Sequence, residues 1–457
     1  MIALIQASTY FQVVSLAAMA DAGLLPPADR RILVLANGSQ MPEITTALPD
    51  YPGFSALAAR FDGVVDLAEL LWPRRCGQFN PRGEELALFE KLLRHRWHLG
   101  SEQVSLVLES IQVNPAQALA RIFFDAPISV HSDGLMSYGP TRNRLPLHML
   151  QRLRETIHID LVPGLEPMLL LEHPVQRKVL KLESLAAIFA ELAAAVDPAS
   201  LHLPQDGALV VGQYLGSLGI LDTAKELELH QDMLLAARDA GARSVVFKPH
   251  PSSGPTAALQ LRARAESLGL DFQILQTDLL AETVITLMKP LAVISCFSTA
   301  LLSAKNMLGV PVIAVGTSEL LQELSPYQNS NRIPLSIVHA QLVQGISSPA
   351  ASDSVDELTP LLRAVAYCMQ YQNLPELRDE AAEFLSVNYL RFEQHFKRRR
   401  IAALELPPSW AHPRRSGRVI PGAAFGRKIQ RRVLRLSSRS LAKVARTLQE
   451  TSTRVSR

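Results

Sequence analysis

The sequence predicts an α/β protein made of two lobes, each built around a mainly parallel β-sheet. Short apolar segments of strand length alternate with longer amphipathic segments of helix length, which is typical of parallel sheets connected by helices. The pattern breaks near residue 197 and starts again at about residue 208. With 48% hydrophobic and 19% charged residues among 457, the chain can bury a sizeable core. We expect a first lobe over residues 1–200, a second over 205–385, and a C-terminal helix with a tail over 386–457.

The first lobe begins with an apolar strand that leads into a helix. Its strands are expected where Val, Ile and Leu gather in runs of four or five, at residues 2–5, 31–35, 63–67, 104–108 and 128–131. The helix after the first strand is expected over residues 12–22. A second helix, rich in Ala, Leu and Glu, closes the lobe at 180–196.

The second lobe shows the alternation more clearly than the first. Its strands are expected at 208–212, 244–248, 271–275, 291–295 and 311–315. Helices are expected between and after them, at 223–240, 257–268, 279–288, 299–307, 355–370 and 376–397. A ligand of such a two-lobed protein is expected in the cleft between the lobes, at the carboxyl ends of the strands.

The composition excludes several classes of protein. Three scattered cysteines are too few for a disulfide framework or a zinc module, and favour a reducing compartment. The chain contains no uninterrupted run of 18 apolar residues, so no membrane-spanning helix is expected. The first residues lack the basic start of a signal peptide. We therefore expect a cytoplasmic protein.

The basic residues are concentrated at the C-terminal end. Residues 397–457 hold 17 Lys and Arg but only 2 Asp and Glu, so the rest of the chain is mildly acidic and is not expected to bind nucleic acid. Apolar residues of this tail recur near helical spacing, at Ile429, Val433, Leu436, Val444 and Leu448. Three interpretations of the tail stay open. It is a solvated segment, or a basic amphipathic one that adsorbs peripherally to an anionic surface, such as the inner face of a membrane. Nucleic-acid binding by the tail is the weakest of the three, because only Trp410 and Phe425 could stack on bases.

The first motif with chemical meaning is Ser132-Asp133-Gly134, at the end of a predicted strand. A carboxylate held there can take a proton from an attacking hydroxyl group. The same pair Asp-Gly is also a common turn signal.

Two further motifs, in the second lobe, suit an anionic ligand. In Lys248-Pro249-His250-Pro251, two prolines restrict the backbone around a histidine at a strand end, where the cation and the imidazole can meet a phosphate. In Ser298-Thr299, hydroxyl groups stand where the next helix begins, so exposed amides and hydroxyls can bind phosphate or carboxylate. The alternatives are a structural histidine and ordinary helix capping.

The ordered set Asp-Gly, His-Pro and Ser-Ser/Thr resembles the bacterial sialyltransferases, and most closely the alpha-2,8-polysialyltransferase-like group. The segments 132–142 and 161–165 are similar to that group too, and the resemblance covers about residues 1–385. It implies a GT-B fold and transfer of a sialic (nonulosonic) acid from CMP-sialic acid to a hydroxyl of a glycan or glycolipid. It also implies inversion at the anomeric carbon, and neither a cofactor nor a metal. The chain contains no Asp-x-Asp, the usual metal clamp of metal-dependent glycosyltransferases.

The resemblance implies roles for the matching residues. Asp133 would be the general base and His250 the general acid at the phosphate. The other donor-binding residues implied are Lys248, Pro251, Glu282 on the ribose, Ser298, Thr299, Gln213 and, in the first lobe, Ser8 and Thr9. In this sequence Ser132 stands where the family often has a second acid, which leaves only Asp133 in that motif.

Other functions remain open at this point. Another kind of GT-B enzyme with a cytidine donor, such as a CDP-glycerol-type transferase, would also use a His-Pro motif. In that case His131 could be the second histidine that such enzymes need near the cleft. A hydrolase or an epimerase on the same scaffold is less expected, since a nucleotide-sugar epimerase would not need the Asp-Gly base. A non-catalytic scaffold would bind CMP without turnover.

Overall fold

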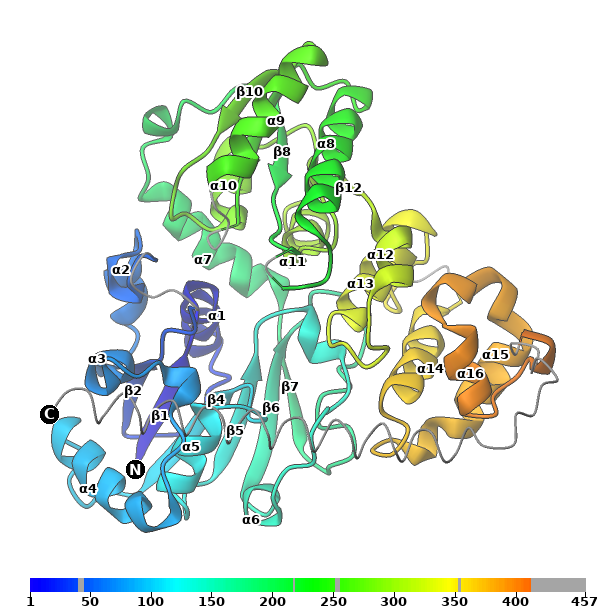
Figure 1. The fold of residues 1–457 in the computed structure, drawn as a ribbon. Helices are drawn as coiled ribbons and strands as arrows, with labels where there is room; N and C mark the ends of the chain where they lie inside the picture. The colour runs from blue at the N-terminus through cyan, green and yellow to red at the C-terminus, as the bar shows by residue number, and fades with distance from the viewer. Residues whose placement is uncertain (40–44, 217, 251–254, 352–354, 412–457) are drawn as a thin grey trace, which may run out of the picture. The chain divides into compact units, whose positions relative to one another are not determined.

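The computed structural model describes residues 1–39, 45–216, 218–250, 255–351 and 355–411 (Figure 1). Residues Met1–Ala411 form one compact unit. The predicted basic tail beyond this unit, and Pro251 of the second motif, lie outside the described residues.

Within these residues, the first half forms a seven-stranded sheet in the order β3-β2-β1-β4-β5-β6-β7, and each neighbouring pair is parallel. Its strands are β1 (Ile2–Ala7), β2 (Arg30–Leu35), β3 (Gly63–Asp66), β4 (Val104–Glu109), β5 (Ile128–Ser132), β6 (Leu153–Ile159) and β7 (Gln176–Leu180). The chain starts in β1, moves outward to β3, and returns to β4 on the other side of β1. The boundary between β1 and β4 is therefore the point where the strand order reverses.

The second half repeats this arrangement with a five-stranded parallel sheet in the order β10-β9-β8-β11-β12. Its strands are β8 (Ala208–Val211), β9 (Ser244–Lys248), β10 (Asp271–Ile274), β11 (Val293–Ser295) and β12 (Val312–Ala314). Here the order reverses between β8 and β11. The predicted α/β class with two mainly parallel sheets is confirmed.

Helices cover both faces of the first sheet. Its helices are α1 (Tyr10–Asp21), α2 (Phe54–Ala58), α3 (Leu67–Leu71), α4 (Leu86–Arg96), α5 (Ala116–Ile122), α6 (Leu147–Leu150) and α7 (Leu182–Ala194). Alternate strand residues point to opposite faces. Ile2 and Leu4 thus pack in the core with α3, α4 and α5, whereas Ala3 and Ile5 pack in the core with α1, α2 and α7.

The second of these cores continues into the second half of the chain. Helix α7 contacts both α1 and α10 (Ala281–Met288). The side-chain amide of Asn306 donates to the carbonyl of Leu161 at 2.8 Å.

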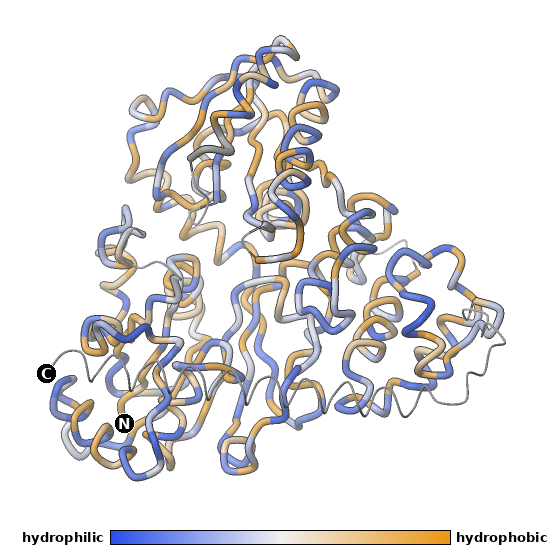
Figure 2. The backbone as a smooth tube through the Cα atoms, in the orientation of Figure 1, coloured by the Kyte–Doolittle hydropathy of each residue, from blue (hydrophilic) through white to orange (hydrophobic). Residues whose placement is uncertain are grey.

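The remaining helices are α8 (Thr223–Asp239), α9 (Pro255–Ser267), α11 (Thr299–Leu302), α12 (Thr317–Glu323), α13 (Arg332–Val338), α14 (Leu358–Gln370), α15 (Arg378–Phe392) and α16 (Arg398–Ala403). Polar residues recur along α8 (Figure 2), as expected for a helix with one face toward solvent.

Two details differ from the sequence-based expectations. Strands β6 and β7 were not predicted, because both carry charged residues in the middle of a sheet. The helix expected over 299–307 is α-helical only to Leu302 and continues as a π-helical turn over Ser303–Met307. The Ser303 hydroxyl donates to the carbonyl of Thr299 at 3.3 Å, a local bond that competes with regular helix geometry. Helix α15 lies within the helix expected over residues 376–397, and the expected lobe boundary at residue 385 stays a prediction.

The three cysteines, Cys76, Cys296 and Cys368, are buried free thiols. Burial raises the pKa of Cys76 and of Cys368 to about 12, and also raises that of Cys296. No helix in the described ranges is both long and apolar enough to cross a membrane.

Candidate active site

The predicted site residues follow strands at the carboxyl edges of the two sheets. In the first sheet, Ser8 and Thr9 follow β1, and Asp133 follows β5. In the second sheet, Gln213 follows β8, His250 follows β9 and Ser298 follows β11. Ligands of open parallel sheets bind at this edge, next to the point where the strand order reverses.

The turn between β1 and α1 fixes the side chain of Gln12. Thr9 caps α1 by accepting a hydrogen bond from the backbone N–H of Gln12 at 3.2 Å. The N–H of Ser8 donates to Oε1 of Gln12 at 2.6 Å, and Gln6 Nε2 donates to the Ser8 hydroxyl at 3.0 Å. Because Oε1 of Gln12 is thus occupied, its Nε2 is left to donate elsewhere. Ser8 and Thr9 act in this structure by shaping the turn.

Two carboxyl groups share that amide. Gln12 hydrogen-bonds Asp133 and also Glu109, the last residue of β4. Burial raises the pKa of Asp133, while burial and the charge of Asp133 together raise the pKa of Glu109 to about 8. Both side chains are only partly covered. Sequence reasoning missed Glu109; the available signal was an acid directly after a predicted strand.

His131, which could have been a second histidine at the site, is fully buried. Its Nε2 donates to the carbonyl of Gln6 at 2.8 Å, and burial lowers its pKa to about 4. The ring is therefore a neutral structural link between β5 and β1. This placement speaks against a cytidine-donor enzyme that relies on His131.

The His-Pro motif presents an uncharged histidine beside a lysine. His250 stacks on Tyr214 with ring centroids 4.0 Å apart. Burial and the charge of Lys248 lower the pKa of His250 to about 4. Lys248 is 7% exposed and donates to the carbonyl of Thr277 at 3.5 Å. Burial lowers its pKa, while Glu282 and Asp278 act in the opposite direction.

Glu282 lies in the first turn of α10 and is buried. Its carboxyl group hydrogen-bonds Ser303 and faces Lys248 electrostatically, while burial raises its pKa. The structure thus groups Glu282 with Lys248 of the His-Pro motif. Its predicted contact with a ribose stays a prediction.

The loops after β8 and β11 are linked by Gln213. Its Oε1 accepts from the N–H of Phe297 at 3.2 Å, and its own N–H donates to Nε2 of His230 at 3.2 Å. Ser298 caps α11 by accepting from the N–H of Ala300 at 3.3 Å. Gln213 and Ser298 therefore set the shape of these loops.

Close approaches of glycines bring the three motifs together. A Cβ atom placed on Gly134 would lie 3.6 Å from Oγ1 of Thr299, so the Asp-Gly motif touches the Ser-Thr motif. A Cβ on Gly212 would lie 2.9 Å from the ring of Phe247 and 3.3 Å from Cα of Pro249. Gly212 thus lets the loop after β8 approach the His-Pro motif. Together with the bond from Phe297 to Gln213, these approaches connect the Asp-Gly motif, the Ser-Thr motif and the loops after β8 and β9.

A sequence model described as alpha-2,8-polysialyltransferase (POLYST) matches residues 3–317 of the chain. The chain belongs to this family. The match includes every motif residue from Ser8 to Thr299 and ends at the start of α12, earlier than the expected limit near 385. The predicted family is confirmed. As a member of this family, the protein is a sialyltransferase, and therefore a glycosyltransferase.

Solved structures resemble the chain at low identity. The GT-B domain (residues 113–497) of a sialyltransferase from Photobacterium damselae is 11% identical, with 74% of this chain and 96% of that chain covered and a TM-score of 0.39. A 2,6-sialyltransferase from Photobacterium sp. JT-ISH-224, solved with CMP and lactose, is 10% identical, with 74% and 76% covered and a TM-score of 0.38. The UDP-GlcNAc 2-epimerase from Methanocaldococcus jannaschii is 10% identical, with 68% and 83% covered and a TM-score of 0.37. No curated protein matches the chain.

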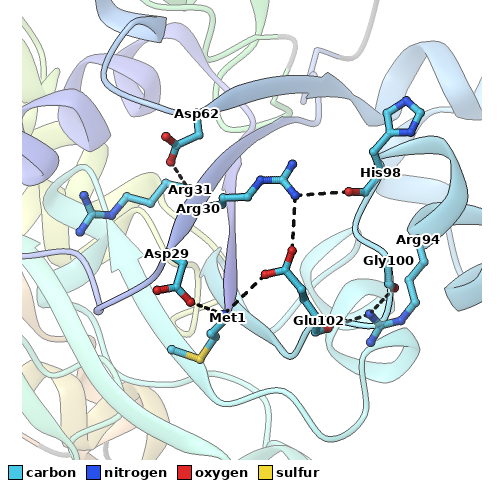
Figure 3. A network of polar contacts seen from close by, with 9 residues as sticks. All are labelled: Met1, Asp29, Arg30, Arg31, Asp62, Arg94, His98, Gly100 and Glu102. Carbon is cyan, nitrogen blue, oxygen red and sulfur yellow. Dashed lines mark hydrogen bonds and ion pairs between the residues drawn. The ribbon is translucent and has the colours of Figure 1, made fainter.

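A surface cavity of about 670 Å³ lies away from the motifs, beside α4 and the loop before β4. Figure 3 shows this amino edge of the first sheet, where Arg94 donates to the carbonyls of Gly100 and Glu102 and so holds the loop. The same view shows Glu102 paired with Arg30 and Asp29 paired with the amino group of Met1. In the described part of the chain, no three His, Cys, Asp or Glu residues gather as a metal site.

The stack of Tyr214 on His250 gives a direct test of the donor side. We expect Tyr214→Ala to raise the donor KM about 2- to 10-fold, because an aromatic pair contributes about 0.5–1.5 kcal/mol. Tyr214→Phe, which keeps the ring, is expected to leave the KM within twofold of wild type. Steady-state kinetics with varied donor concentration measures both. Equal donor KM values for the alanine variant and wild type would show that the stack does not hold His250.

Proposed function

We propose that this enzyme transfers a sialic (nonulosonic) acid from CMP-sialic acid to a glycan hydroxyl, with inversion and without a metal. The observation that carries the proposal is the contact between the Asp-Gly and Ser-Thr motifs. It brings Gly134, the neighbour of Asp133 in the first half of the chain, close to Thr299, whose loop in the second half is proposed to bind the anionic donor.

The acceptor side needs a base, because a sugar hydroxyl is a poor nucleophile. In the proposed reaction Asp133 takes the hydroxyl proton as the oxygen attacks the anomeric carbon. The bond between that carbon and the CMP phosphate breaks at the same time. One displacement with the base and the leaving group on opposite sides inverts the anomeric centre.

The donor side needs groups that stabilise anions, because CMP-sialic acid carries a phosphodiester and a carboxylate. Lys248 supplies a positive charge, His250 an N–H, and Ser298 and Thr299 supply hydroxyls at a helix start. His250 is neutral in the free enzyme, and a bound phosphate would raise its pKa and let it protonate the leaving group. These residues offer the charge stabilisation that a metal supplies in other glycosyltransferases.

The acceptor is proposed to be a glycan or glycolipid that can itself end in sialic acid. Membership in an alpha-2,8-polysialyltransferase family supports an alpha-2,8 linkage and repeated transfer. In that case each product is the next acceptor, and the site must accept an anionic sugar on the side of Asp133 as well.

CMP release is the measurement that tests the proposal. The protein is incubated with CMP-sialic acid in EDTA, with and without sialylated and galactosyl acceptors, and in parallel with CDP-glycerol. We expect acceptor-stimulated CMP release in EDTA and no turnover of CDP-glycerol. Turnover of CDP-glycerol alone would overturn the donor, and release only with added Mg²⁺ would overturn metal independence. CMP binding without turnover of any donor would indicate a non-catalytic scaffold.

A further inference from the structure

The Asp-Gly motif lacks a second acidic residue in the sequence, but a neighbouring strand places one beside Asp133. Ser132 occupies its expected place, but Glu109 ends the neighbouring strand β4. In the β4–β5 register Glu109 is paired with His131, and the chain reaches Asp133 two residues later. Glu109 therefore stands at the carboxyl edge beside β1, where the strand order reverses.

Among the described residues of the first half, none supplies a counter-charge to the two carboxyl groups of Glu109 and Asp133. Gln12 of α1 donates one amide hydrogen to each carboxyl, with its orientation fixed by the N–H of Ser8. His131 of β5 is buried and neutral, and its Nε2 is used by the carbonyl of Gln6. Asp133, after β5, is the charge that acts on Glu109. Two like charges so close and half-buried disfavour the doubly ionised pair.

We propose that Glu109 is a positioning residue that shares one proton with Asp133, so that the acceptor side of the site carries a single negative charge at neutral pH. This inference rests on the proposed function, in which Asp133 is the base. Asp133 gains the proton of the acceptor hydroxyl during transfer, while Glu109 keeps its own proton. The single charge matters because donor and sialylated acceptor are anions, which a doubly ionised pair would repel.

The direction of the pH effect follows from the raised pKa of Glu109. Below about pH 8 the pair keeps one proton, and above it both carboxyls ionise. We therefore expect kcat/KM, which reports the free enzyme, to fall on the alkaline side with an apparent pKa near 8. His250, with a pKa of about 4, does not titrate in that range.

The test is the pH profile of kcat/KM for acceptor-stimulated CMP release between pH 5 and 10. Glu109→Gln keeps the shape of the side chain but cannot ionise. We expect this variant to lose the alkaline limb near pH 8 and to keep neutral-pH activity within about 10-fold of wild type. Gln12→Met removes the amide that favours the ionised carboxyls, so we expect its limb to move to higher pH. A lost limb in one variant and a shifted limb in the other separate a shared proton from a general loss of structure.

The matched control is Glu102→Gln. Glu102 lies just before β4, at the amino edge of the sheet, is 44% exposed and pairs with Arg30 (Figure 3). This variant is expected to reproduce the wild-type profile, and thermal unfolding confirms that each protein is folded.

Three results would overturn the inference. One is an alkaline limb that persists in Glu109→Gln, which would assign it to another group such as Lys248. Another is a folded Glu109→Gln that is inactive at every pH, which would make Glu109 itself the base. The third applies if Glu109→Gln does not fold: an alkaline limb in Gln12→Met at the same pH as in wild type would then overturn the inference. Failure of the proposed function is distinguishable, because wild type would then release no CMP at any pH.

Discussion

Replacing Asp133 by asparagine is expected to lower acceptor-dependent kcat by about 10²- to 10⁴-fold, the range that a positioned general base contributes. Asparagine has nearly the same shape and can still accept a hydrogen bond from Gln12, but it cannot take the proton of the acceptor hydroxyl. Donor binding should survive, because the groups proposed for the phosphate lie on the second sheet. Stopped-time assays of acceptor sialylation and calorimetric titration with CMP measure the two effects separately.

Asp29→Asn is the matched control for this substitution. Asp29 is 82% exposed and lies before β2, at the opposite edge of the same sheet (Figure 3). We expect full activity from it and a thermal unfolding profile like that of wild type, because an exposed ion pair contributes little to stability. Asp133→Asn activity within 10-fold of this control would exclude Asp133 as the base.

His250→Asn is expected to lower kcat/KM by about 10²- to 10³-fold, the loss seen when one preorganised donor to a developing anion is removed. In the free enzyme His250 is neutral, because burial and Lys248 lower its pKa to about 4. Its N–H can donate to the phosphate in this form, and the bound anion then favours the imidazolium that releases a proton to the leaving group. Steady-state kinetics with CMP-sialic acid measures the loss.

His98→Asn serves as the control for the histidine substitution. His98 is exposed at the amino edge and has φ 51°, a conformation that asparagine tolerates. Its variant is expected to match wild type. If His250→Asn is as active as His98→Asn, the His-Pro motif has no catalytic role.

Much of the fold could be predicted because most strands are apolar on both faces. β1 is buried along its whole length, as is β8, so each reads in sequence as a continuous hydrophobic run. β6 and β7 could not be found in this way. Glu155 of β6 is buried and pairs with Lys178 of β7 at 2.8 Å, so charges that suggest a loop in sequence neutralise each other across two strands.

The site shows the same division between local and spatial information. Asp133, His250 and Thr299 could be predicted because each stands in a short motif, and the order of the motifs resembles a family. Glu109 stands in no motif, and only the pairing of β4 with β5 brings it beside Asp133. The stack of Tyr214 on His250 likewise joins residues from two loops. Sequence patterns locate residues along one segment, whereas shared protons and ring stacks depend on which strands are neighbours.

The buried cysteines make this enzyme well suited to site-specific labelling. A maleimide reacts with a thiolate, and Cys76, Cys296 and Cys368 are covered thiols whose pKa burial raises. A single cysteine introduced at an exposed position on each sheet would therefore carry a fluorophore without prior removal of the native ones. Energy transfer between two such dyes could then follow, during turnover, whether the halves that carry Asp133 and His250 change their separation when donor and acceptor bind.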